Sequence, residues 1–252
     1  MKRIVIGLPV YKPHDPELYA RSMHSSDPLP AGLAHPAFEE SFYKTVKDLR
    51  NEFRFSLATV TGDGQLDRAR AILLGDYLWI REQTTVDFYW MLDSDVSWDP
   101  LDVFRMVQRK VDCIGAAYSI KRDADAALGR WAGRTLEGET PDATGLLRVL
   151  YLAGGFTLVS DSAMQKLIHK YAHLRFINNP PSLRPSYGLW RSEFGEAPKE
   201  WGVEGAKEYL GEDYTFSWRL EQAGIPRYLD LNVKLGHWAG DECWRLPEEK
   251  AA

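Results

Sequence analysis

Two aspartates, Asp93 and Asp95, directly follow a short apolar run at 86–92 and are well placed for chemistry. The run is rich in aromatic and aliphatic residues, which predicts a strand buried on both faces. Residues two apart on a strand point to the same side, so the carboxylates can converge where open α/β sheets bind ligands. Two hard oxygen ligands suit Mg²⁺ or Mn²⁺, and substrate phosphates often complete the coordination shell of these ions. The pattern therefore predicts a metal-dependent enzyme acting on a nucleotide or phosphate donor.

An EF-hand calcium loop would also begin with acidic residues at alternate positions, as 93–99 does. Trp98 stands where that loop requires glycine, and Phe104 stands where it requires the closing glutamate. Asp99 followed by Pro100 instead predicts a helix N-cap and the first helical residue. Asp99 is therefore expected to be structural.

Strand and helix patterns alternate along the chain, which is typical of a mostly parallel sheet flanked by helices. Besides 86–92, strands are expected at 3–10, 53–60, 111–118, 146–159 and 228–233. Helices are expected at 38–52, 67–82, 100–110, 160–171 and 212–223. The predicted fold class is α/β with a Rossmann-like central sheet. One domain is expected over 1–252, with a core at about 3–240 and a charged tail at 243–252.

Composition narrows the class of protein further. The net charge of −5 argues against a general nucleic-acid binder. With two cysteines, no disulfide framework is expected, and a cytoplasmic location fits. The apolar start is too short for a signal peptide and has no small-residue cleavage site, and no run reaches membrane-spanning length.

Gly154 and Gly155 interrupt the β-prone run at 146–159. Glycine within a strand pattern marks a bulge or a place where a ligand approaches the backbone closely. Packing glycines are an equally weighted alternative.

Glu212 and Asp213 open an expected helix, where the helix dipole alone favours acidic residues. The functional alternative is a general base, a carboxylate that takes the proton of an attacking hydroxyl. Taken alone, the pair favours the structural interpretation.

His237 follows the last expected strand and could reach the same metal as Asp93 and Asp95. Neutral imidazole is an acceptable ligand for Mn²⁺ and a poor one for Mg²⁺. A purely structural histidine is the more common alternative.

An aromatic, proline-rich segment at 178–211 includes Tyr187, Trp190 and Trp201. Flat aromatic faces can stack on sugar rings and so bind an acceptor. A hydrophobic cluster beneath a long loop is at least as good an interpretation of any one of these residues.

In order along the chain, several segments resemble the GT-A-fold glycosyltransferases, especially the family 2-like enzymes of bacteria and viruses. The resemblance covers roughly 3–240, and the matching segments are IVIGLPVY, LDRARAILL, MLDSDVSW, LAGGFTLVSDSAMQKL, YGLW, LGEDYTFSWRLEQAG and LNVKLGHWAG. It implies a nucleotide-sugar donor, with UDP the favoured nucleotide, and a saccharide or other hydroxyl acceptor.

The resemblance also implies roles for single residues. Asp93, Asp95 and His237 would hold Mn²⁺ or Mg²⁺, while Asp213 would be the base of an inverting transfer with Glu212 in support. The implied donor-binding residues are Pro9, Tyr11, Arg70, Asp93, Ser94, Asp95, Gly154 and Gly155.

Two departures from the family pattern and three alternatives stay open. The turn TGDG at 61–64 replaces an Asp/Ser-rich turn that contacts the base in many family 2 enzymes, and the first strand's turn lacks the usual asparagine. A sugar-1-phosphate nucleotidyltransferase has a related sheet, but it would need a glycine-rich basic loop where this chain has GLPVYKPHDP. A non-catalytic carbohydrate-binding scaffold is a second alternative, and a modified DNA base as acceptor in a virus is a third.

Overall fold

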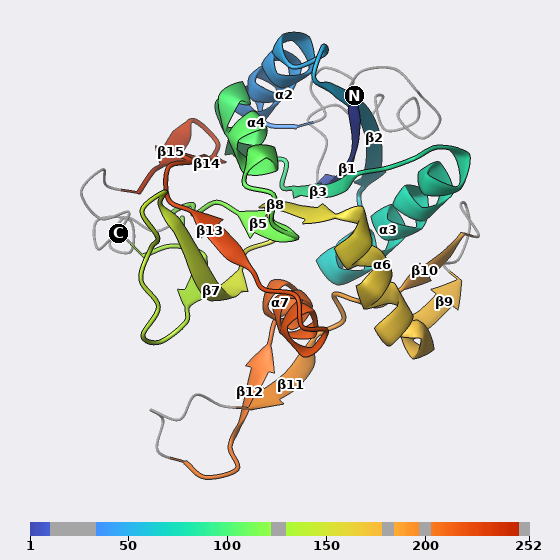
Figure 1. Ribbon diagram of the computed structural model, residues 1–252, viewed down its shortest axis with the longest axis vertical. Coiled ribbons are helices and arrows are strands. Elements are labelled where there is room, and N and C mark those ends of the chain that lie inside the picture. The colour runs from blue at the N-terminus through green and yellow to red at the C-terminus, as the bar shows by residue number, and fades with distance from the viewer. Residues whose placement is uncertain (11–33, 122–129, 178–183, 197–202, 247–252) are drawn as a thin grey trace.

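The computed structural model describes residues 1–10, 34–121, 130–177, 184–196 and 203–246. Within these ranges an eight-stranded sheet runs in the order β2-β1-β3-β8-β5-β13-β7-β6 (Figure 1). Its strands are β1 (Lys2–Val10), β2 (Phe53–Thr61), β3 (Phe88–Leu92), β5 (Cys113–Gly115), β6 (Gly133–Thr135), β7 (Leu146–Leu152), β8 (Phe156–Ser160) and β13 (Tyr228–Asp230). β7 and β8 run opposite to the other strands, so the sheet is mostly parallel in direction.

Helices cover both faces of this sheet. Helices α2 (Pro36–Asp48) and α4 (Pro100–Gln108) share one hydrophobic cluster with it. Helices α3 (Leu66–Gln83), α6 (Asp161–Lys170) and α7 (Glu212–Gln222) share the other. The predicted α/β class, a mostly parallel sheet flanked by helices, is confirmed.

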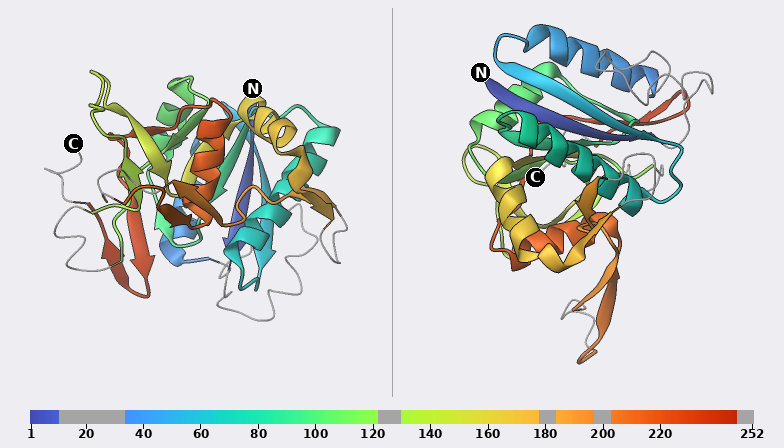
Figure 2. Two further views of the ribbon diagram at one scale, coloured as in Figure 1. Left: turned by 90° about the horizontal axis from the view of Figure 1, so that it is seen from below. Right: turned by 90° about the vertical axis from the view of Figure 1, so that its right-hand side faces the viewer.

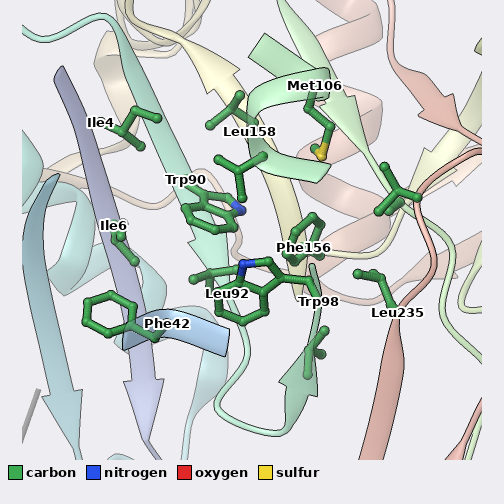
Figure 3. Close-up of a cluster of buried hydrophobic side chains, with 14 of the residues drawn as sticks. Ile4, Ile6, Phe42, Trp90, Leu92, Trp98, Met106, Phe156, Leu158 and Leu235 are labelled. Carbon is green, nitrogen blue, oxygen red and sulfur yellow. The ribbon is translucent and has the colours of Figure 1, made fainter. Parts of the chain in front are cut away.

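Strand β3 is buried throughout because it contributes to both clusters. Trp90 and Leu92 point into one cluster, while Tyr89 and Met91 point into the other. Figure 3 shows Trp90 beside Trp98, whose ring lies edge-on at 5.3 Å between centroids. This packing fixes the end of β3 and therefore the start of the acidic turn that follows it.

Smaller sheets complete the described chain. β4 (Val96–Ser97), β14 (Gly236–Ala239) and β15 (Glu242–Trp244) form one. β11 (Glu193–Glu196) pairs with β12 (Lys207–Leu210), and β9 (Arg175–Ile177), which follows the short helix η1 (Ala172–Leu174), pairs with β10 (Pro185–Tyr187). Figure 2 shows the β11–β12 pair projecting from the body of the molecule.

Most expected elements lie where the patterns predicted them. Asp99 caps α4 through a capping box with Asp102, as its position before Pro100 indicated. Two details were wrong: the run at 146–159 forms two strands, β7 and β8, which a turn at the glycines separates and which are not neighbours in the sheet, and His237 lies inside β14. The expected charged tail at 243–252 begins inside β15, which includes Cys243.

Both cysteines are free thiols, as expected. None of the helices in the described ranges has the length and apolar character needed to cross a membrane.

Candidate functional site

The acidic turn after β3 lies at the carboxyl ends of β1, β2 and β3, which are parallel neighbours. A cleft of about 260 Å³ opens there, lined by Pro9, Asp63, Gly64, Leu66, Asp93, Ser94 and Asp95. Its volume is slightly below the roughly 300–1,000 Å³ typical of small-molecule pockets, so it suits part of a ligand such as a nucleotide. Pro9 and Ser94 therefore line a cleft, as their predicted donor roles require.

Arg70 of α3 is the buried centre of the site. Its Nη2 lies 3.2 Å from Asp93 Oδ1, and its Nη1 lies 2.9 Å from Asp213 Oδ1. Glu212 Oε1 is 4.0 Å from Nη2. The guanidinium thus joins the acidic turn after β3 to the first turn of α7, rather than facing the cleft.

Gly154 and Gly155 allow this arrangement. A Cβ atom at Gly154 would lie 1.5 Å from Arg70 Nη1 and 2.3 Å from Asp213 Oδ1. A Cβ at Gly155 would lie 2.4 Å from Asp93 Oδ2. Protein side chains therefore approach the backbone closely at both glycines, which fits the interpretation as packing glycines rather than the approach of a ligand.

The charges around Arg70 are unequal, since one guanidinium faces three carboxylates. Burial raises the pKa of Asp93 to about 7; Arg70 opposes that rise, and Asp213 and Asp95 add to it. Burial and the neighbouring Asp213 also raise the pKa of Glu212. Burial disfavours the charge on Arg70, but the three carboxylates outweigh it and raise its pKa. The site as a whole has an excess of negative charge that a divalent cation would reduce.

The two carboxylate oxygens of Asp95 have different surroundings. Oδ2 accepts a hydrogen bond from the Lys121 ammonium group. Oδ1 is buried and has no hydrogen-bond partner, while His237 Nε2 lies 3.8 Å away. A buried carboxylate oxygen without a partner is costly, and a bound cation is one way to satisfy it.

The pairing of β14 with β4 places His237 beside Asp95. His237 pairs with Val96 in this antiparallel ladder, and the Trp238 amide donates to the Asp95 carbonyl at 2.9 Å. Nδ1 of His237 lies 2.7 Å from the Ser119 carbonyl, which only accepts, so the neutral ring has its proton on Nδ1. Burial lowers the pKa of His237, against the effects of Ser119 and Asp95. The ring is therefore held neutral with the Nε2 lone pair available to a metal.

These groups fit a divalent metal, but only in part as predicted. Asp95 Oδ1 and His237 Nε2 form an oxygen and nitrogen pair suited to Mn²⁺. Asp93 instead pairs with Arg70, and nowhere in the described ranges do three or more acidic, histidine or cysteine side chains gather at metal-binding distance. Substrate phosphates or water would therefore have to supply further ligands.

Of the expected acceptor residues, the structure describes Tyr187 and Trp190. Tyr187 is half-buried in β10. The indole of Trp190 is fully buried and stacks on Phe216 with centroids 4.6 Å apart, so it has no free face for a sugar ring, and its expected role is wrong. Trp201 and the donor residue Tyr11 lie outside the described residues.

Sequence reasoning missed Asp63 and Lys121. Asp63 lines the cleft, and Arg68 holds both its oxygens at 2.8 and 2.9 Å. Its position in the turn after the second strand, at the same sheet edge as Asp93, was the available signal. Lys121 had no comparable signal, because only the fold brings it to Asp95.

A pair of exposed aromatic side chains was also missed. Phe194 and Tyr209 face each other across β11 and β12 with centroids 5.7 Å apart and are 64% and 65% exposed. The other face of this hairpin is anchored, since Arg134 donates to Glu208 at 2.7 and 2.8 Å. β12 leads through Gly211 directly into the helix that carries Asp213.

No protein-family model matches this chain, and no curated protein matches it. Among solved structures, A197 from STIV aligns over 98% of this chain and 95% of its own, with 14% identity and a TM-score of 0.49. GalNAc-T7, solved with UDP, GalNAc and Mn²⁺, aligns over 97% of this chain and 44% of its own, with 11% identity and a TM-score of 0.47.

A nucleoside-diphosphate-sugar pyrophosphorylase from Vibrio cholerae aligns over 90% of both chains, with 12% identity and a TM-score of 0.39. All three TM-scores are below 0.5, and this chain spans less than half of GalNAc-T7. Membership of family 2 therefore stays a prediction.

Proposed function

We propose that this protein is a metal-dependent glycosyltransferase that moves a sugar from a nucleotide-sugar donor, with UDP favoured, to an acceptor hydroxyl. The observation that carries the proposal is the unpartnered Asp95 Oδ1 facing His237 Nε2 beside a cleft at the carboxyl ends of parallel strands. Asp95 and His237 would hold Mn²⁺ or Mg²⁺, with the donor diphosphate completing the shell. The excess of negative charge around Arg70 supports the need for a cation there.

The nucleotide would occupy the cleft lined by Pro9, Asp63 and Ser94. Asp63 is held by Arg68, so its carboxylate is preoriented at the wall where a ribose hydroxyl or base edge would lie. Asp93 would contact the ribose or the metal. Pro9 would offer an apolar surface to the nucleoside.

The metal, when bound, would stabilise the charge that develops on the departing diphosphate. Asp213 would accept the acceptor's hydroxyl proton as the new carbon–oxygen bond forms. The bond from the sugar carbon to the phosphate oxygen breaks in the same step, so attack comes from the opposite face with inversion. Because Oδ1 of Asp213 is buried against Arg70, proton transfer would fall to Oδ2.

The acceptor would be a saccharide, or another molecule with a free hydroxyl, bound on the side of α7. Phe194 and Tyr209 support this, because exposed rings on an anchored hairpin offer stacking faces to sugar rings. Gly211 links their hairpin to the first turn of α7, where Asp213 lies.

Calorimetric titration with Mn²⁺ and UDP tests the proposal. Wild type should bind UDP with Mn²⁺ and much more weakly in EDTA. Asp95→Asn and His237→Ala should each weaken Mn²⁺ binding by about 10- to 100-fold, in line with losses seen when metal sites are disturbed. His169→Ala, which removes an exposed histidine from α6, is the matched control and should change nothing.

UDP binding that is independent of metal, or unaffected by both site variants, would contradict the proposal. Binding of no nucleotide would instead favour a non-catalytic scaffold. Release of pyrophosphate from a nucleoside triphosphate and a sugar phosphate would identify a nucleotidyltransferase.

A further inference from the structure

Lys121 lies on the loop after β5 and contacts the same carboxylate as the candidate metal. Its ammonium donates to Asp95 Oδ2, while Oδ1 of that carboxylate faces His237. Ser119, two residues earlier, holds the His237 ring through its carbonyl. One short loop therefore orients both members of the candidate metal pair.

A lysine and a divalent cation on one carboxylate compete. Both would be drawn to Asp95 by the same negative charge, and two cations on one carboxylate repel each other. Arg70 is not free to adjust, because it is buried and held by three carboxylates. Lys121 differs from Arg70, because its side chain is 28% exposed and its stem is flexible.

We propose that Lys121 is a counter-ion of Asp95 in the donor-free protein and a ligand of the donor diphosphate once metal binds. This inference rests on the proposed function and assigns the leaving-group contact of that site. A lysine ammonium is a compact charge with three donors, well suited to phosphate oxygens. The same side chain then weakens metal binding before the nucleotide arrives and strengthens nucleotide binding afterwards.

Lys121→Met should change the affinity for Mn²⁺ and the affinity for UDP in opposite directions. Mn²⁺ alone should bind several-fold more tightly, because the competing ammonium is gone. UDP in saturating Mn²⁺ should bind about tenfold more weakly, since one charge-assisted hydrogen bond is lost. Uridine, which has no phosphate, should bind equally to both proteins. Lys121→Arg should retain UDP binding close to wild type.

Electron paramagnetic resonance of free Mn²⁺ gives the affinity for Mn²⁺, and calorimetric titration gives the affinity for UDP. Both are measured on the intact chain. Lys166→Met, on the exposed side of α6, is the control and should match wild type in both. Weaker Mn²⁺ binding in Lys121→Met and unchanged UDP binding would overturn the inference and make Lys121 a support for Asp95. Unchanged values for both ligands would also overturn it. Failure of wild type to bind Mn²⁺ or UDP would overturn the proposed function itself.

Discussion

Arg70 of α3 and Asp213 of α7 meet in the interior of the protein, with Nη1 2.9 Å from Oδ1. The other terminal nitrogen of Arg70 reaches Asp93 at 3.2 Å. One buried cation thus connects the carboxylate proposed as base with the acidic turn proposed to contact donor and metal. The position of α7 relative to the cleft depends on this guanidinium.

Arg70→Met should therefore destabilise the protein strongly. Removing one partner of a buried ion pair typically costs about 3–5 kcal/mol, because the remaining charges are left uncompensated. Urea unfolding in EDTA measures the loss. Arg54→Met, which removes an exposed arginine from β2, should leave the unfolding midpoint almost unchanged, and equal losses in both variants would contradict this assignment.

Gly154→Ala should disturb the same centre by steric conflict. Its Cβ would lie 1.5 Å from Arg70 Nη1, so the guanidinium must move away from Asp213. We expect a lower melting temperature and loss of Mn²⁺-dependent UDP binding. Gly188→Ala is a suitable control, because the nearest atom to its Cβ is 3.8 Å away. Normal UDP binding by Gly154→Ala would show that the close approach has no functional role.

The raised pKa of Asp93 predicts a pH dependence of stability in metal-free protein. Asp93 has a native pKa of about 7 against an ordinary value of 3.8, so between these values the native state binds a proton that the unfolded chain lacks. The contribution of this group to the free energy of unfolding therefore decreases as pH rises from about 4 to about 7.

In Asp93→Asn this contribution is absent, so its unfolding free energy should fall less steeply with pH. Urea titrations in EDTA at several pH values between 5 and 8 compare the two proteins. Parallel curves for wild type and variant would show that Asp93 ionises normally in the folded protein.

Asp213→Asn should separate binding from transfer. The amide cannot act as a base, and general-base catalysis typically contributes about 10²–10⁴-fold in rate. We expect UDP binding with Mn²⁺ to stay within a few-fold of wild type, while UDP release from a panel of UDP-sugars falls by at least about 100-fold. Glu212→Gln should reduce the rate of UDP release by a smaller factor. Release at the wild-type rate in Asp213→Asn would exclude Asp213 as base.

The sheet and its helices could be predicted from the sequence because the signals are local. The apolar run at 88–92 before Asp93, the Asp99–Pro100 cap and the TGDG turn each fix a boundary within a few residues. Gly154 and Gly155 were recognisable as unusual within a strand pattern, but the pattern did not distinguish a ligand from protein side chains as the group that approaches them. The same patterns located the sheet edge that carries the candidate site.

Contacts between side chains of distant elements could not be predicted from these local patterns. Asp93 and Asp95 were expected to converge on one point, but Asp93 pairs with Arg70 while Asp95 pairs with Lys121 and faces His237. Trp190 has the same local signal as a surface aromatic, and only tertiary packing buries it. Phe194 and Tyr209 become a pair only when β11 and β12 align.

The most direct test of a metal site at Asp95 and His237 is crystallography of the protein with Mn²⁺ and UDP, with anomalous data at the manganese edge. We expect one strong anomalous peak between Asp95 Oδ1 and His237 Nε2, with the UDP diphosphate beside it and the nucleoside in the cleft near Asp63. A peak elsewhere, or UDP bound with no manganese at Asp95, would contradict it.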